Sequence, residues 1–336
     1  MTEKTNDLQP ELIQNIHWGY IRSHVLSTAV ELDVFTVVHA GNNSVEKVAR
    51  MINVPLRSCR FLLDALVGMG LLGKNRGAYK LENEARNFLV RGEPNYLGSY
   101  LQLQEPMVQN WFGLTHAVKT GKPLEPNLDL EHRKTFFKEL VKNIFPVSYA
   151  SGVILCKKIG VGKTLKSQKV LDLGCGACPW SIAFCLADGD SQIVAVDFPE
   201  VLEVAQAFTK RFHVQRQFEF KGGDYHHLEL QPQSYDVIIL GQICHMEGEA
   251  ATRKLFKKCY DALKPGGKLL VAEFIANDLR TGPELPLMFA LTMLLFTEQG
   301  DVYTSKDLKR WLDFVGFKKV STQGVQYPAA VMVGTK

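Results

Sequence analysis

The pattern of apolar and polar residues changes near residue 169, and the two parts of the chain predict different folds. Beyond that point, helical stretches separate short, β-rich apolar runs at 169–173, 192–197, 218–222, 236–240 and 268–273. Nearly continuous apolar runs between helices are typical of strands buried on both faces of a parallel sheet. The C-terminal half is therefore predicted to be a Rossmann-like, doubly wound α/β domain.

The N-terminal part has the period of short helices instead. Apolar residues in 45–52 recur at helical spacing behind a capping serine, Ser44, and a second helix is predicted to start at Pro55. Two short strands around a glycine-containing turn follow at 71–81. Helix, turn, helix and hairpin is the winged-helix pattern. From about 95 to 158 the chain is again mainly helical, with a loop at 121–126.

Length and composition agree with a multidomain globular protein. A chain of 336 residues suits two domains, and we predict a winged-helix domain at 1–105, a helical linker at 106–165 and the α/β domain at 166–336. No apolar run approaches the ~18–20 residues of a membrane span, and the N-terminus lacks the pattern of a signal peptide. The seven scattered cysteines predict free thiols and a cytoplasmic protein.

The strongest chemical signal is a glycine turn between a predicted strand and a predicted helix. Gly174 and Gly176 let the backbone approach a ligand closely. Asp197 follows Gly176 by 21 positions, a spacing that suits a carboxylate accepting hydrogen bonds from both ribose hydroxyls. A dinucleotide fingerprint would have a third glycine where this chain has Pro179. A nucleoside without a pyrophosphate, such as S-adenosylmethionine, is therefore favoured over a nicotinamide cofactor.

A metal site is the alternative use of this turn, because Cys175 and Cys178 form a C-x-x-C pair. No second pair of cysteines or histidines lies at zinc spacing, so we predict that no metal binds there. The adjacent His226 and His227 have no matching partner in the sequence either, and we expect them in a solvated loop.

Four segments resemble the motifs of the class I S-adenosylmethionine-dependent small-molecule O-methyltransferases, in the caffeate and acetylserotonin O-methyltransferase-like group. They are Asp172 to Gly176, Asp197-Phe198-Pro199, Gly223-Asp224-Tyr225 and the turn at 263–269, and together they cover most of 169–275. The resemblance implies that Asp224 meets the adenine amino group. The cofactor-binding residues that it implies are Asp172, Gly174, Gly176, Asp197, Phe198, Asp224, Tyr225 and Gln242.

Methylation of a phenol, whose reference pKa is about 10, benefits from a neighbouring base, and histidine is the natural choice. His245 would lie just past the carboxyl end of the strand at 236–240, and the resemblance implies that it is the general base and that Glu273 orients it. The group's acids next to the base and before the last helix are replaced by Met246 and Val302. The departure leaves either a dyad of His245 and Glu273 or C- or N-methylation, which needs a different base or none.

An apolar pocket is expected for the acceptor, a small aromatic or polyketide-like metabolite. Three of its predicted residues share a helix at 285–297, where the same spacing also suits core packing. The predicted pocket residues are Trp111, Phe112, Phe145, Met288, Phe289 and Met293.

The winged helix raises a second class of function, a DNA-binding regulator. Residues 1–100 hold 11 lysines and arginines against 10 acidic residues, a poor footprint for phosphate contacts. In the resembled family this module is a dimerisation domain, and the partner contributes to the substrate pocket. We therefore expect a homodimer with a small-molecule substrate, and neither nucleic acid nor membrane as a partner.

Overall fold

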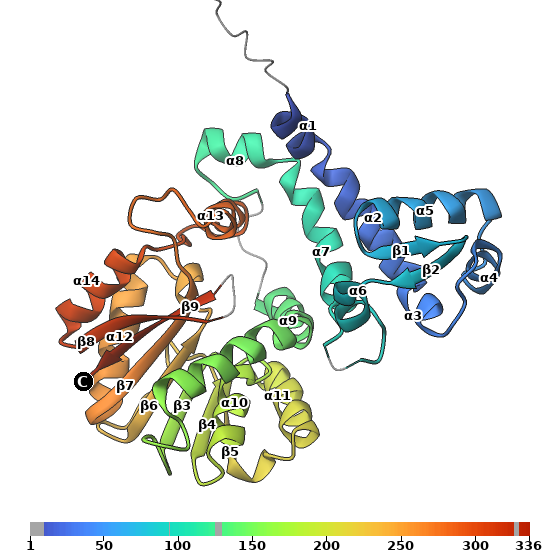
Figure 1. The fold of residues 1–336 in the computed structure, drawn as a ribbon. Helices are drawn as coiled ribbons and strands as arrows, with labels where there is room; N and C mark the ends of the chain where they lie inside the picture. Colours follow the sequence, from blue (N-terminus) through green and yellow to red (C-terminus); the bar gives the residue numbers. More distant parts are fainter. Residues whose placement is uncertain (1–9, 94, 125–129, 326–328) are drawn as a thin grey trace, which may run out of the picture. The chain divides into compact units, whose positions relative to one another are not determined.

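The computed structural model describes residues 10–93, 95–124, 130–325 and 329–336, with the backbone alone at 103–107 and 130–135. The chain divides into two compact units, Met1–Glu105 and Pro106–Lys336 (Figure 1). The predicted linker at 106–165 is part of the second unit by this division, and its separate identity stays a prediction.

The N-terminal unit is mainly helical and contains the predicted winged-helix elements. Ser44 caps α4, since its hydroxyl accepts a hydrogen bond from the backbone N–H of Lys47 at 3.3 Å, and Pro55 precedes α5. The two strands pair antiparallel, with Leu72 opposite Leu81. The elements are α1 (Glu11–His17), α2 (Gly19–Glu31), α3 (Val34–His39), α4 (Val45–Met51), α5 (Leu56–Gly68), β1 (Leu72–Asn75), β2 (Ala78–Leu81), α6 (Asn83–Phe88) and α7 (Gly98–Trp111), which runs into the second unit.

The described part of the second unit is built on a seven-stranded sheet with the order β5-β4-β3-β6-β7-β9-β8. The five predicted strands are present and parallel, whereas β9 runs antiparallel to both β7 and β8. The strands are β3 (Lys169–Leu173), β4 (Gln192–Asp197), β5 (Phe218–Gly222), β6 (Tyr235–Gly241), β7 (Leu263–Phe274), β8 (Lys318–Gly324) and β9 (Ala329–Thr335).

Helices cover both faces of this sheet (Figure 1). Alternate residues of each central strand face opposite clusters: Val237 and Ile239 pack with α9, α10 and α11, while Ile238 and Leu240 pack with α12 and α14. Because both faces are buried, the strands read as continuous apolar runs. The helices are α8 (Leu114–Thr120), α9 (Leu130–Ile159), α10 (Pro179–Ala187), α11 (Pro199–Arg211), α12 (Glu249–Ala262), α13 (Glu284–Phe296) and α14 (Ser305–Val315), with short 3₁₀ turns η1 (Gln215–Gln217) and η2 (Cys244–Met246).

One predicted turn was wrong. The turn predicted at 263–269 is part of β7, because Gly266 and Gly267 exchange backbone hydrogen bonds of 3.0 and 2.9 Å with Lys336 at the end of the sheet. The region from 95 to 158 is mainly helical, as predicted, with α7 and α8 separated at residues 112–113. Residues 125 and 126 of the loop predicted at 121–126 lie outside the described residues. Over the described chain, we find no helix with the length and apolar content that crossing a bilayer requires.

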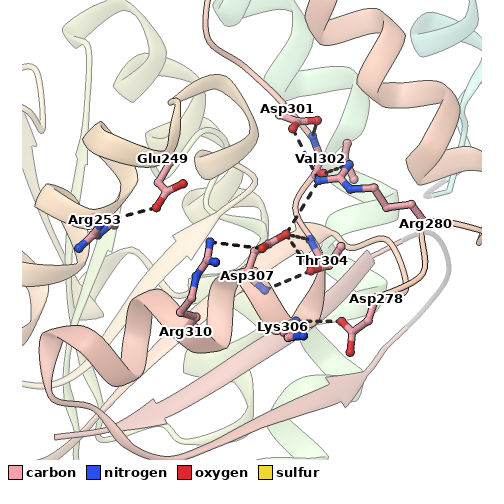
Figure 2. A network of polar contacts seen from close by, with 10 residues as sticks. All are labelled: Glu249, Arg253, Asp278, Arg280, Asp301, Val302, Thr304, Lys306, Asp307 and Arg310. Carbon is pink, nitrogen blue, oxygen red and sulfur yellow. Dashed lines mark hydrogen bonds and ion pairs between the residues drawn. The ribbon is translucent and has the colours of Figure 1, made fainter.

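The start of α14 is fixed by a network of polar contacts (Figure 2). The Thr304 hydroxyl accepts from the Asp307 backbone N–H at 3.1 Å, and the Asp307 carboxylate accepts from the Thr304 N–H at 3.2 Å, which completes a capping box. Arg280 and Arg310 approach the same carboxylate at 3.9 and 3.5 Å. The loop before α14 is therefore held at a defined place beside β7.

Replacing Thr304 by alanine removes one half of this capping box. Loss of such a cap costs about 1 kcal/mol, so the melting temperature of the second unit should fall by about 2–4 °C in calorimetry. Thr304→Ser keeps the capping oxygen and should melt close to the native protein. An alanine variant that melts with the native protein would show that the cap contributes nothing.

Candidate active site

A glycine turn leads from β3 into α10. Gly174 and Gly176 have φ angles of +62° and +55°, in the left-handed region that favours glycine. A Cβ atom on Gly174 would lie 2.8 Å from Ile243 Cδ1, closer than packed atoms approach. The turn therefore favours glycine for its conformation, and a side chain at Gly174 would also displace Ile243.

Asp197, at the end of β4, lies against this turn. Its Oδ2 accepts from the Gly176 N–H at 2.9 Å, and its Oδ1 accepts from the Phe198 N–H at 2.8 Å. Burial raises the pKa of Asp197 to about 6. Each carboxylate oxygen has two lone pairs, so both can still accept a hydrogen bond from a ligand hydroxyl. These two carboxylate oxygens can therefore accept from the two hydroxyls of a ribose.

Asp172 lies beneath the turn. Its side chain is buried and accepts from the Ser181 hydroxyl of α10 at 2.6 Å, and burial raises its pKa to about 7. The carboxyl thereby ties β3 to the first turn of α10. Its predicted contact with the cofactor stays a prediction.

The two cysteines of the turn are also buried, and both carry free thiols. The Cys178 N–H donates to the Cys175 carbonyl at 2.8 Å, and burial raises the pKa of both thiols. Within the described residues, no three His, Cys, Asp or Glu side chains are grouped to hold a metal ion.

The loop after β5 approaches the same turn from the next strand. The Asp224 carboxylate accepts from the His226 N–H at 2.8 Å, and Tyr225 Cε1 lies 3.6 Å from the position that a Cβ on Gly174 would take. His226 and His227 are both exposed, as expected, and each approaches a carboxylate, that of Glu247 at 3.0 Å and that of Asp224 at 3.8 Å. The structure therefore brings Asp224 and Tyr225 to the edge of the sheet that holds the glycine turn.

Gln242, another predicted cofactor residue, follows β6 at a φ of +60°. Its Oε1 accepts from the Ser148 hydroxyl of α9 at 3.0 Å, and its N–H donates to the Ala272 carbonyl at 2.8 Å. The residue thus connects α9 to the ends of β6 and β7.

His245 and Glu273 form a buried pair at the ends of the neighbouring strands β6 and β7. His245 Nδ1 lies 2.8 Å from Glu273 Oε2, and the His245 backbone N–H donates to Glu273 Oε1 at 3.2 Å. The carbonyl of His245 accepts from the Asp301 N–H at 2.9 Å. When Nδ1 carries the proton donated to Glu273, Nε2 keeps its lone pair free to accept a proton.

Aromatic rings line this pair. The ring of Phe289, from α13, meets the His245 ring edge to face at 5.1 Å between centroids, and Phe274 lies 6.0 Å from His245. Phe274 and Phe289 are themselves 4.4 Å apart. The predicted pocket residue Phe289 therefore lies beside the predicted base.

The other predicted pocket residues are spread more widely. On α13, Met288 is half exposed and Met293 is buried. Trp111 is partly buried at the end of α7, while the side chain of Phe112 is 81% exposed. Phe145 is buried in the core, and its ring lies 4.4 Å from Phe208 and stacks on Tyr149 at 5.3 Å. With 5% of its surface exposed, Phe145 has little area left for an acceptor.

Val302 is buried at the place where the resembled group has a third acid. Its carbonyl accepts from Arg280 at 3.1 Å, and the carboxylate of the neighbouring Asp301 lies 3.7 Å from the same guanidinium (Figure 2). Within the described residues, the carboxylate that contacts the His245 imidazole is that of Glu273. The geometry supports a dyad.

Sequence reasoning missed three residues of this site: Ser181, Phe274 and Glu247. Ser181 carried a signal, because it is a polar residue in the first turn of an otherwise apolar helix. Phe274 directly follows Glu273, and Glu247 lies two residues after His245. No local pattern indicates where the side chains of Phe274 and Glu247 point.

Comparison with known proteins agrees with this geometry. The chain is 26% identical to 3-hydroxy-5-methyl-1-naphthoate 3-O-methyltransferase of Streptomyces sahachiroi, over 97% of this chain and 95% of the relative. It is 29% identical to the tetracenomycin polyketide synthesis 8-O-methyl transferase of Streptomyces glaucescens, over 100% and 99% of the two chains. Human N-acetylserotonin methyltransferase, solved in complex with S-adenosylmethionine, has the same fold, with a TM-score of 0.87 at 23% identity over 100% and 99% of the chains.

Two family models also match this chain. The model of the O-methyltransferase domain matches residues 142–318, more than half of the chain, and that of the O-methyltransferase dimerisation domain matches residues 15–91. The chain therefore belongs to the O-methyltransferase family and contains the dimerisation domain of these enzymes.

Proposed function

We propose that this chain transfers a methyl group from S-adenosylmethionine to a hydroxyl of a small aromatic or polyketide-like metabolite, with His245 as the general base. The observation that carries the proposal is the buried contact of 2.8 Å between His245 Nδ1 and Glu273 Oε2. It lies at the carboxyl ends of adjacent parallel strands, where ligands bind in open α/β sheets.

The glycine turn and the two acids beyond it fit the cofactor. Gly174 and Gly176 give the turn its left-handed backbone, Asp197 offers acceptors to the ribose hydroxyls, and Asp224 follows the neighbouring strand. When bound, S-adenosylmethionine would supply the methyl group of its sulfonium to a nucleophile, and S-adenosylhomocysteine would be the leaving group. The human relative was solved with this cofactor, which supports the same choice here.

The aromatic surroundings of His245 support an aromatic acceptor. Phe274 and Phe289 offer ring faces and edges beside the imidazole. The two Streptomyces relatives are named for O-methylation of a naphthoate and of a polyketide, both products of secondary metabolism. The acceptor hydroxyl is thus inferred to be phenolic.

His245 removes the proton of that hydroxyl. Glu273 holds Nδ1, so Nε2 accepts the proton, and the buried carboxylate then stabilises the imidazolium that forms. In the second contact, the His245 backbone N–H donates to Glu273 Oε1, and this keeps the carboxylate aligned with the ring. A single carboxylate can therefore orient the base without the two acids that Met246 and Val302 replace.

The dimerisation domain implies a homodimer, and we propose that it forms through the first two helices. An apolar surface that water disfavours lies on these helices, with residues 60–73% exposed in the isolated chain: Leu12, Ile13, Ile16, Trp18 and Tyr20.

The free state of all seven cysteines supports the reducing cytoplasm as the compartment.

Replacement of His245 by alanine tests the base. With the hydroxynaphthoate that the native enzyme methylates best, kcat should fall about 10²–10⁴-fold because the phenol keeps its proton. The affinity for S-adenosylhomocysteine, measured by calorimetry, should stay within about twofold. A loss below about fivefold in kcat would exclude His245 as an essential base.

Cofactor affinity should depend on pH through Asp197. Burial raises the pKa of this carboxyl to about 6, so it becomes protonated, and loses acceptors for the ribose, as the pH falls below that value. Calorimetric titration with S-adenosylhomocysteine should give a constant Kd above pH 7 and one about tenfold weaker at pH 5. Asp197→Asn should bind more weakly at pH 7.5 and lack the slope. A native Kd that is flat down to pH 5 would contradict the role of Asp197.

The double substitution Ile13→Glu and Ile16→Glu tests the dimer surface. Burying two carboxylates is unfavourable, so the variant should elute as a monomer in size-exclusion chromatography with light scattering. Phe314→Glu places a charge at an equally exposed apolar position, 74% exposed on α14, and should leave the dimer intact. A dimeric double variant would place the interface elsewhere.

A further inference from the structure

The loop that follows β5, residues 223–227, is held by two side chains from other elements. The Nζ of Lys258, in α12, donates to the Tyr225 carbonyl at 2.6 Å and to the His226 carbonyl at 3.2 Å. The Glu247 carboxylate accepts from the Tyr225 hydroxyl at 2.7 Å and lies 3.0 Å from His226 Nε2, both contacts on Oε1. The loop is therefore clamped through its backbone and its side chains.

Glu247 belongs to the segment that carries the predicted base. It follows η2, and its backbone N–H donates to the Cys244 carbonyl at 3.1 Å, one residue before His245. Its side chain is 12% exposed. A carboxylate at this depth needs donors, and Tyr225 and His226 supply them. The position of the carboxylate is thus coupled to the position of His245.

Tyr225 is the bridge to the other side of the site. Its ring lies against the glycine turn, with Cε1 at 3.6 Å from the position of a Cβ on Gly174, while its hydroxyl bonds to Glu247. Its neighbour Asp224 is the residue predicted to meet the adenine. One side chain therefore contacts both the cofactor turn and the segment of the base.

We propose that Glu247 is a positioning residue that holds the Tyr225 ring and the Asp224 carboxylate toward the adenosine, in register with His245. The proposal rests on the cofactor site of the proposed function. The hydrogen bond from the Tyr225 hydroxyl to Glu247 is a directional contact, so it fixes the orientation of the ring as well as its distance. Neither side chain is assigned to the reacting atoms. Cofactor affinity, and not the methyl-transfer step, should depend on their bond.

Two variants remove this bond from either end: Glu247→Leu, whose side chain of similar size has no acceptor, and Tyr225→Phe, which lacks the hydroxyl. The Kd for S-adenosylhomocysteine by calorimetry should rise about tenfold in each, with a matching rise in KM for S-adenosylmethionine, and Glu247→Leu should keep kcat within about twofold of the native value. The double variant should bind no more weakly than Glu247→Leu alone, because the Tyr225 hydroxyl has no acceptor left to lose once the carboxylate is gone. Glu249→Leu, on an exposed glutamate two residues further on, is the matched control and should bind like the native protein.

The outcomes separate this inference from the proposed function. Native protein that fails to bind S-adenosylhomocysteine would overturn both. Native binding together with unchanged Kd values in both single variants would overturn the positioning role alone. Independent losses that multiply to about 100-fold in the double variant would also overturn it, since Glu247 and Tyr225 would then act separately. A fall in kcat with no change in Kd would contradict it as well.

Discussion

The contact between His245 and Glu273 is the interaction on which the described site depends. A carboxylate 2% exposed is costly to bury unless its oxygens are bonded, and here one oxygen bonds the imidazole and the other the backbone of the same residue. The pair forms because β6 and β7 are adjacent and parallel, with Gly241 opposite Ala272, so that both strands end at the same edge of the sheet. His245, the proposed base, is therefore placed by the buried central strands of the sheet.

The order of the strands divides the site into two halves. Beyond β3 lie β4 and β5, whose ends carry Asp197 and Asp224, and on the other side of β3 lie β6 and β7 with the buried pair. The direction of winding reverses between β3 and β6, which is where ligands bind in such sheets. The glycine turn at the end of β3 lies at that point. The hydrogen bond from Tyr225 to Glu247 then joins the two halves across it.

The antiparallel edge of the sheet contributes to the same arrangement. β9 pairs with β7 along its length and so fixes the strand that ends in Glu273 and Phe274. Arg280 and the capping box of α14 hold the loop whose Asp301 N–H bonds the His245 carbonyl (Figure 2). Val302 packs into the core at the position of an acid in the resembled group. An apolar residue there is compatible with the site because Glu273 alone satisfies the imidazole nitrogen.

The sequence by itself determined the features that depend on local pattern. Nearly continuous apolar runs predicted β3, β4, β6 and β7, since both faces of those strands are buried, and Gly174, Gly176 and Asp197 predicted the turn by their spacing. Motif resemblance nominated His245 and Glu273. Only the tertiary structure decided that these two, 28 positions apart, are in contact, that Phe145 packs in the core and that Glu247 meets Tyr225. β8 was missed because it is a largely exposed edge strand without the apolar run of its neighbours, whereas β9 was missed although it is such a run. Such contacts depend on strand order and on the direction of each side chain, which long-range packing determines and no local pattern encodes.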